Sequence, residues 1–232
     1  MKILSFLFCW IICISLYGQD QLSDQDSLRQ KLGKELLLNG KEYRHYYPRT
    51  KGKQYIAEKV ILVGNLWYEG VYYEDLQLNF DIYNNLLFVA FVSKNEKLYL
   101  ILNQAKIQAF EIIGMRFINL PDSSYQGLAG GIYEEAFRQG ERHLFIKHKK
   151  SLTKEVDTLA GTLQKFERKT SYYLVEKGVV YKIRRKKDLI HALGENSDFE
   201  QQLKENKLKL RKNRSDFEHN LLQALRYGIS QN

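Results

Sequence analysis

Cysteine is almost absent from this 232-residue chain, and its two copies, Cys9 and Cys13, both lie in an apolar run near the N-terminus. We expect that run to be removed on export, which leaves a mature chain without cysteine. Disulfide bonds, thiol catalysis and cysteine metal sites are then excluded together. An exported protein of this length without disulfides needs a sizeable hydrophobic core, and the chain is long enough to bury one.

Proline is equally scarce, and with only Pro48 and Pro121 the chain has no proline-rich linker. Histidine occurs but does not cluster, because the five histidines are spread along the chain without ligand spacing: His45, His143, His148, His191 and His219. A zinc site needs three or four converging ligands. We therefore predict no metal and no cofactor.

Linear catalytic motifs are missing as well. The chain contains no Gly-x-Ser-x-Gly elbow. Carboxylates are paired at Glu134-Glu135 and Glu74-Asp75, but adjacent residues on a strand face opposite ways and cannot act together on one bond. We interpret both pairs as solvated edge charges. We predict that the protein is not an enzyme, although catalytic groups can also converge from distant positions.

The N-terminus has the pattern of a secretory signal. Lys2 precedes an apolar run from Ile3 to Leu16, and Gly18 and Gln19 lead into a polar stretch. We predict a signal peptide over residues 1–18, cleaved next to Gly18 or Gln19. The alternative is a retained membrane anchor, but the run is short for a span and no basic stop follows it.

The stretch from Val60 to Leu120 is typical of β structure. Tyr72, Leu76, Leu78 and Phe80 alternate with polar residues, which puts one face on a core and the other in water. The run from Leu86 to Val92 is apolar throughout, which favours a strand buried on both faces. The breaks are short and turn-like, and short loops join antiparallel neighbours.

The rest of the chain divides by composition. Residues 19–54 are a polar N-terminal segment with a short helix that ends near Asn39-Gly40. Strands are predicted over 132–137, 142–149 and a last hairpin over 172–183. Residues 151–170 are polar, and Leu152, Val156, Leu159 and Leu163 have near-helical spacing, so we interpret them as a long loop or a short helix.

From Lys186 the pattern becomes helical and charged. Ser197 and Ser215 each begin a Ser-Asp-Phe-Glu sequence that matches a capping box. Phe217, Leu221, Leu222 and Leu225 form one apolar stripe that can dock on a sheet. The predicted fold is mainly β: an antiparallel hairpin meander over 55–185, as a curved sheet, sandwich or partly closed barrel, with a basic helical C-terminal segment over 186–232.

Two features point to binding. The formal net charge is +9, and loss of Lys2 with the signal leaves +8, so anionic partners fit best. Basic residues cluster at 147–150 and at 182–187, while aromatic residues crowd 67–83. Ordinary surface charge and ordinary core pairing are the alternatives. The candidate binding residues, with an exposed aromatic pair first, are Trp67, Tyr73, Lys149, Lys150, Arg184, Arg185 and Lys186.

The chain resembles a group of uncharacterised exported β-rich proteins of the Bacteroidota. The resembling residues are Gly70, the stretch Leu76-x-Leu78-x-Phe80-Asp81-Ile82-Tyr83, residues 110–117, Tyr172-Tyr173-Leu174 and Lys186-Lys187-Asp188-Leu189. The resemblance implies export into a diderm envelope, to the periplasm or the periplasmic face of the outer membrane. It implies no activity or catalytic residue.

Our leading hypothesis is a non-catalytic binding or assembly module that docks on a membrane-associated protein complex of the envelope. The basic residues would attract an acidic protein face or an anionic membrane surface, and the aromatic residues would be buried in the interface. Nucleic acid is not expected as a partner of an exported protein. The alternative is a soluble carrier whose sheet encloses a small apolar or glycan ligand.

Overall fold

The computed structural model describes residues 36–44, 47, 50–92, 97–157, 161–194, 197–211 and 215–227. The predicted signal peptide and most of the predicted N-terminal helix lie outside the described residues. Residues 36 and 37 are helical, so the helix ends before Asn39.

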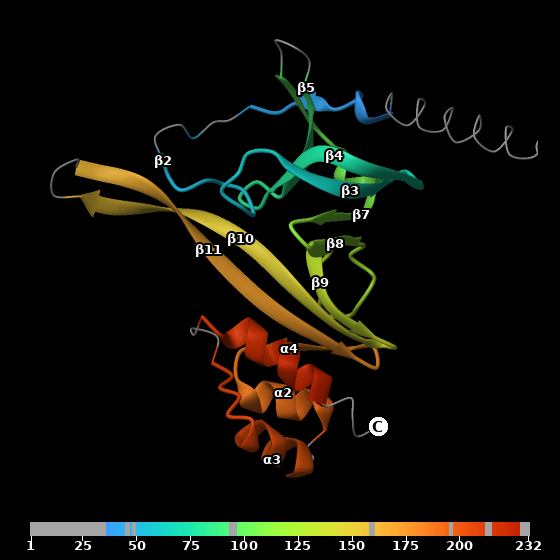
Figure 1. Ribbon diagram of the computed structural model, residues 1–232, viewed down its shortest axis with the longest axis vertical. Coiled ribbons are helices and arrows are strands. Elements are labelled where there is room, and N and C mark those ends of the chain that lie inside the picture. The colour runs from blue at the N-terminus through green and yellow to red at the C-terminus, as the bar shows by residue number, and fades with distance from the viewer. Residues whose placement is uncertain are drawn as a thin grey trace, which may run out of the picture.

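The described strands form one open, mostly antiparallel curved sheet (Figure 1), which confirms the predicted fold class. Their order in the sheet is β1-β6-β5-β4-β3-β7-β8-β9-β10-β11-β12, with β2 parallel to β11. The strands are β1 (Lys41–Glu42), β2 (Thr50–Lys51), β3 (Leu62–Tyr68), β4 (Val71–Asp81), β5 (Leu86–Val92), β6 (Lys97–Ile101), β7 (Ile107–Ile112), β8 (Met115–Leu120), β9 (Gly131–Gln139), β10 (Arg142–Asp157), β11 (Gly161–Glu176) and β12 (Val179–Ile183). A short 3-10 helix, η1 (Gln104–Lys106), lies between β6 and β7.

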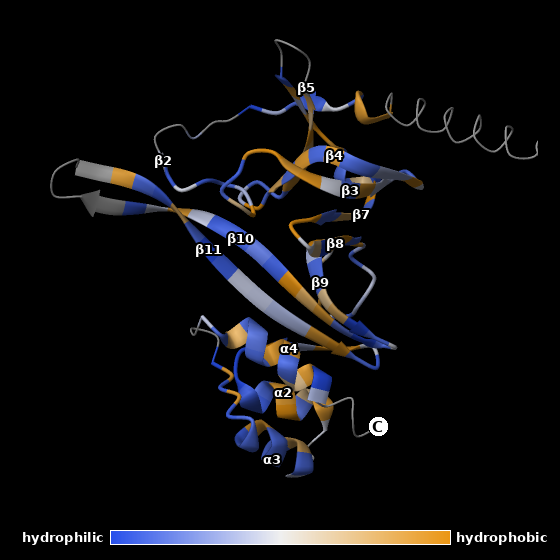
Figure 2. Ribbon diagram, viewed as in Figure 1, coloured by the Kyte–Doolittle hydropathy of each residue, from blue (hydrophilic) through white to orange (hydrophobic). Residues whose placement is uncertain are grey.

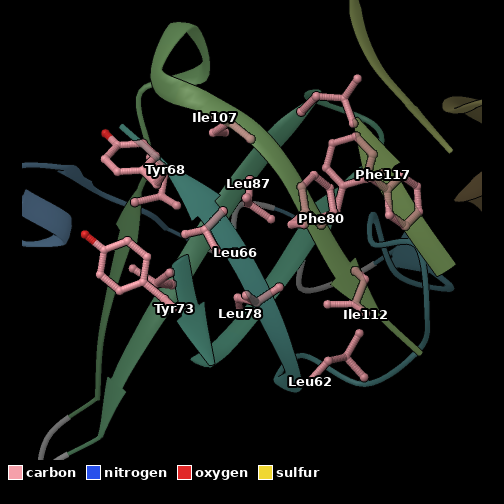
Figure 3. Packing of buried hydrophobic residues seen from close by; sticks show 14 of the residues in the cluster. Leu62, Leu66, Tyr68, Tyr73, Leu78, Phe80, Leu87, Ile107, Ile112 and Phe117 are labelled. Atoms are coloured by element: carbon pink, nitrogen blue, oxygen red, sulfur yellow. The ribbon is translucent and has the colours of Figure 1, made fainter. Parts of the chain in front are cut away.

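The first core lies inside the curve of β3 to β8. Figure 3 shows its members converging from these strands, with Leu66, Leu78 and Phe80 at the centre. The rings of Phe110 and Phe117 stack with their centres 4.8 Å apart. The alternation seen in the sequence therefore does face a core at Leu76, Leu78 and Phe80, whereas Tyr72 is exposed.

The β10–β11 hairpin is the longest element, with sixteen residues in each strand. Its pairing runs without interruption from His143↔Val175 to Asp157↔Gly161. The prediction of a loop or short helix over 151–170 is therefore wrong. The stretch is mostly polar (Figure 2), and its few apolar residues, among them Leu152 and Phe166, do not recur with a period of two that would mark it as a strand.

Three helices, α2 (Lys186–Leu193), α3 (Ser197–Glu205) and α4 (Phe217–Tyr227), pack against one face of this hairpin (Figure 1). Leu144 and Leu174 of the hairpin join Phe217 and Leu221 of α4 in a second core. The Tyr172 and Phe217 rings meet edge to face at 4.9 Å. The C-terminal helices are thus docked on the sheet, as the apolar stripe predicts.

The helices begin close to the predicted serines. Helix α3 begins at Ser197, and α4 begins at Phe217, where the Asp216 carbonyl accepts the first helical hydrogen bond from the Asn220 N–H. Gly194 ends α2 with φ +80°, a conformation that suits glycine.

The loop between β8 and β9 covers the other face of the hairpin. Leu128 from this loop packs with Tyr133, Phe145 and Val175 in a third, small core. Phe145 and Val175 alternate along their strands with the residues that the helices cover. The hairpin is therefore buried on both faces at this end, and its middle is left to polar side chains.

We predict that α4 unfolds together with the sheet. Replacing Phe217, which is 1% exposed, with Ala should lower the free energy of unfolding by about 3–5 kcal/mol because a large buried ring is lost. His219→Ala, on the exposed side of the same helix, should change it by about 0.5 kcal/mol or less. Urea unfolding followed by circular dichroism measures both. Equal effects of the two substitutions would contradict the docking.

Candidate functional site

A pocket of about 770 Å³ opens on the face of the hairpin opposite the helices. Its walls come from the β4–β5 turn, the β8–β9 loop and strands β9 to β12. The lining residues are Ile82, Tyr83, Asn85, Gly127, Leu128, Ala129, Gly130, Tyr133, Lys147, Lys149, Lys150, Ser151, Lys169, Ser171, Tyr173 and Lys182. The set holds five lysines and no carboxylate.

Strand alternation and register bring most of these lysines together. Lys147 and Lys149 are two apart on β10 and so share a face. Lys169 of β11 lies directly opposite Lys149, and Lys182 of β12 lies opposite Tyr173. The two basic clusters of the sequence thus meet, in part, in one pocket.

Lys147 is the most enclosed of the pocket lysines. Its Nζ donates to the Ile132 carbonyl at 2.9 Å and lies 4.3 Å from the centre of the Tyr133 ring. Burial, with the charge of Lys149 as the second cause, lowers the pKa of Lys147 from 10.5 to about 8. The Lys147 ammonium therefore loses its proton near pH 8.

Lys150 is engaged in hydrogen bonds to another segment of the chain. Its Nζ donates to the carbonyls of Lys53 and Tyr55 at 2.5 and 2.7 Å, and its backbone N–H donates to the Ile82 carbonyl. Burial lowers its pKa. These bonds join the hairpin to the segment that precedes β3, so this predicted binding residue has a structural role.

Lys149 and Lys169 differ from Lys147 and Lys150. Both Lys149 and Lys169 are exposed, and neither side chain makes a hydrogen bond or ion pair within the described part of the chain. Lys182 lies over the Tyr173 ring, with its Nζ 5.5 Å from the ring centre. These three ammonium groups are the ones available to an external anion.

The predicted residues Arg184, Arg185 and Lys186 lie beyond this pocket. The Asp188 carboxylate accepts from the backbone N–H groups of Arg184 and Arg185, and Lys186 Nζ donates to the Glu200 carbonyl at 3.4 Å. Arg184 and Arg185 share a second, more open hollow of about 460 Å³ with Lys182 and Asp188. Asp188 partly neutralises this group, so it extends the basic surface less strongly.

The aromatic pair does not form as predicted. Trp67 is half-buried, with the Arg116 guanidinium 4.9 Å from its ring centre and Tyr72 at 4.5 Å. Tyr73, predicted to be exposed, is only 5% exposed and belongs to the first core, whereas Tyr72 is 44% exposed. The prediction for Tyr73 is wrong.

A β-bulge explains this error. Gly64 pairs with Leu76, but Leu66 pairs with Tyr73, so β4 holds one extra residue between these pairs. Asp75 lies there with φ +50°. The extra residue inverts which side chains face the core, because alternation restarts after a bulge.

Glu134 and Glu135 are not the solvated edge charges predicted. Glu134 is 6% exposed and lies 2.5 Å from Nε2 of His148, and Glu135 lies 3.0 Å from Nδ1 of His143. Arg168 donates to Nδ1 of His148 at 2.9 Å. Arginine can only donate, so the neutral His148 carries its hydrogen on Nε2, toward Glu134.

This buried chain lies outside the pocket, since neither Glu134 nor His148 lines it. His148 is 4% exposed, and its ring centre lies 6.1 Å from that of Phe117 in the first core. No group of three or more His, Cys, Asp or Glu in the described ranges could hold a metal ion.

Sequence reasoning missed Lys169, Tyr133 and Tyr173 as pocket residues. Lys169 fell in the stretch interpreted as a loop or short helix. The alternating patterns Lys147-x-Lys149-x-Ser151 and Lys169-x-Ser171-x-Tyr173 would have placed all six side chains on one face, had both stretches been interpreted as paired strands.

No family model, curated protein or solved structure matches the chain. None of the helices in the described part of the chain has the length and apolar character that crossing a bilayer requires. The pocket itself is therefore the basis for a functional proposal.

We predict that Lys147 titrates apart from the other pocket lysines. Its ε-carbon signal in ¹³C NMR should show a midpoint near pH 8, and Lys149→Gln should raise that pKa because a like charge is removed. Between about pH 8 and pH 10.5, Lys147 is protonated more often in the unfolded chain than in the folded protein. The contribution of Lys147 to the free energy of unfolding therefore increases with pH across this window. A Lys147 midpoint near 10.5 would contradict the geometry.

Proposed function

We propose that this protein is a non-catalytic binding or assembly module of the cell envelope, and that its lysine pocket holds an anionic group of its partner. The observation that carries the proposal is a pocket lined by five lysines without one carboxylate. Such a surface attracts anions and raises their association rate.

The buried polar groups support a binding role over a catalytic one. His148 and His143 are each engaged with a carboxylate, and Lys150 is engaged with two carbonyls. The pocket is lined by lysines together with tyrosine and serine side chains. The ammonium groups attract an anion, and the hydroxyl groups can donate hydrogen bonds to it. Export and the envelope location rest on the N-terminal pattern and on the resemblance described above.

A soluble carrier is the second candidate, and the size of the pocket favours it. About 770 Å³ lies within the range of small-molecule sites. The lysines indicate that the cargo of such a carrier would be anionic, whereas the sequence led us to expect a small apolar or glycan ligand.

The test is retention of an anionic species from envelope extract by the purified mature protein. The protein is washed at low salt and denatured, and the released species is identified by mass spectrometry. We expect one anionic species in stoichiometric amount. A wash at high salt before denaturation should remove it, because salt screens the attraction. The double variant Lys149→Gln/Lys169→Gln should lose it. Lys154→Gln, an exposed lysine of β10 outside the pocket, should keep it.

The nature of the retained species separates the two candidates. A protein or lipid supports the assembly module, and a small molecule supports the carrier. Equal retention by wild type and the double variant would overturn the proposal, as would an empty wild-type protein at low salt.

A further inference from the structure

The pairing of Lys149 with Lys169 is electrostatically unfavourable in the protein alone. The two residues lie directly opposite on β10 and β11, where facing side chains are about 4.5–5.5 Å apart at Cβ. Lys147 is two positions along the same face. Like charges directly opposite each other destabilise a sheet. No lining residue offsets them, because the lining contains no carboxylate.

The fold does not require lysine at these two positions. The helices cover the opposite face of the hairpin, and the side chains of Lys149 and Lys169 make no hydrogen bond or ion pair to any described residue. Lys147 and Lys150, in contrast, donate to backbone carbonyls. The pocket thus has two bonded lysines that shape it and two facing lysines whose ammonium groups make no ion pair to a described residue. Glu167, two positions from Lys169 on the same face of β11, lies outside the lining.

The side chains around the pair indicate the chemistry of the anion. Every cation that lines the pocket is a lysine, a point charge that binds phosphate, and none is an arginine, whose planar fork suits carboxylate and phosphate alike. Phosphate is a compact, multiply charged anion that lysine binds well. The Ser151 hydroxyl, which is buried and has no partner among the described residues, is a further donor at the same wall.

We propose that the pocket binds a phosphate group, with Lys149 and Lys169 on either side of it and Lys182 toward the rest of the ligand. This inference rests on the proposed function and names the chemistry of its partner. A phosphorylated sugar and the head group of a phosphate-bearing lipid share this chemistry, and the experiment below distinguishes them.

Thermal unfolding of the mature protein with defined probes tests the inference. The probes are inorganic pyrophosphate, glucose 6-phosphate, and vesicles with and without phosphatidic acid, each compared with sodium chloride at equal ionic strength. At about 100 times its Kd a binding probe should raise the Tm by roughly 5–10 °C. Because phosphate stabilises many proteins by exclusion from their surface, the measured quantity is the difference between wild type and variant.

Two matched variants make the result specific. Lys149→Gln/Lys169→Gln should bind the probe about 10- to 100-fold more weakly in calorimetric titration, since charge-assisted hydrogen bonds are lost. Lys154→Gln should bind like the wild type. Both substituted lysines are exposed, so the double variant should keep the wild-type circular dichroism spectrum, which verifies its folding.

The outcomes distinguish a failure of the phosphate inference from a failure of the proposed binding site. A response to glucose 6-phosphate in solution indicates a phosphorylated small molecule, and a response only to phosphatidic acid vesicles indicates a lipid head group. If no phosphate probe acts but the retained envelope species still depends on Lys149 and Lys169, the phosphate inference is wrong and the proposed function stands. If the double variant responds to the probes like the wild type, the site is wrong.

Discussion

The pairing of β10 with β11 is the interaction on which the rest of the structure depends. These strands continue the curved sheet through β9, and Lys150 joins them to the segment before β3. One face of the hairpin carries the helices α2 to α4, and the other carries the lysine pocket. Because successive side chains point to opposite faces, one hairpin can bury Leu144 and Ile146 while it presents Lys147 and Lys149.

Sequence patterns predicted the fold where one face of an element is clearly apolar. Val71–Asp81 alternates in part, Leu86–Val92 is apolar throughout, and the stripe from Phe217 to Leu225 has helical spacing, so these elements were found. The pattern failed over 151–170, where β10 and β11 are mostly polar and their few apolar residues, such as Leu152 and Phe166, do not alternate regularly along either strand. It failed at Tyr73 because a single bulge residue inverts the alternation.

The sequence alone could predict only part of the candidate site. Lys149 and Lys150 are adjacent and chemically identical, yet one is uncompensated at the pocket and the other is bonded to the carbonyls of Lys53 and Tyr55. No local pattern distinguishes them, because the difference arises from a contact with residues about a hundred positions earlier. Likewise, Glu134 and Glu135 looked like edge charges because their histidine partners come from the next strand.

The central claim is that Lys149 and Lys169 face each other without an ion pair to either ammonium group and repel, and a double-mutant cycle of stability tests it most directly. At low salt, Lys149→Gln and Lys169→Gln should each raise the free energy of unfolding by a few tenths of a kcal/mol. The double variant should gain less than the sum, because one repulsion can be removed only once. The coupling should fade at high salt. If each single substitution lowers stability, or if the coupling is attractive, the two lysines are compensated and the account is contradicted.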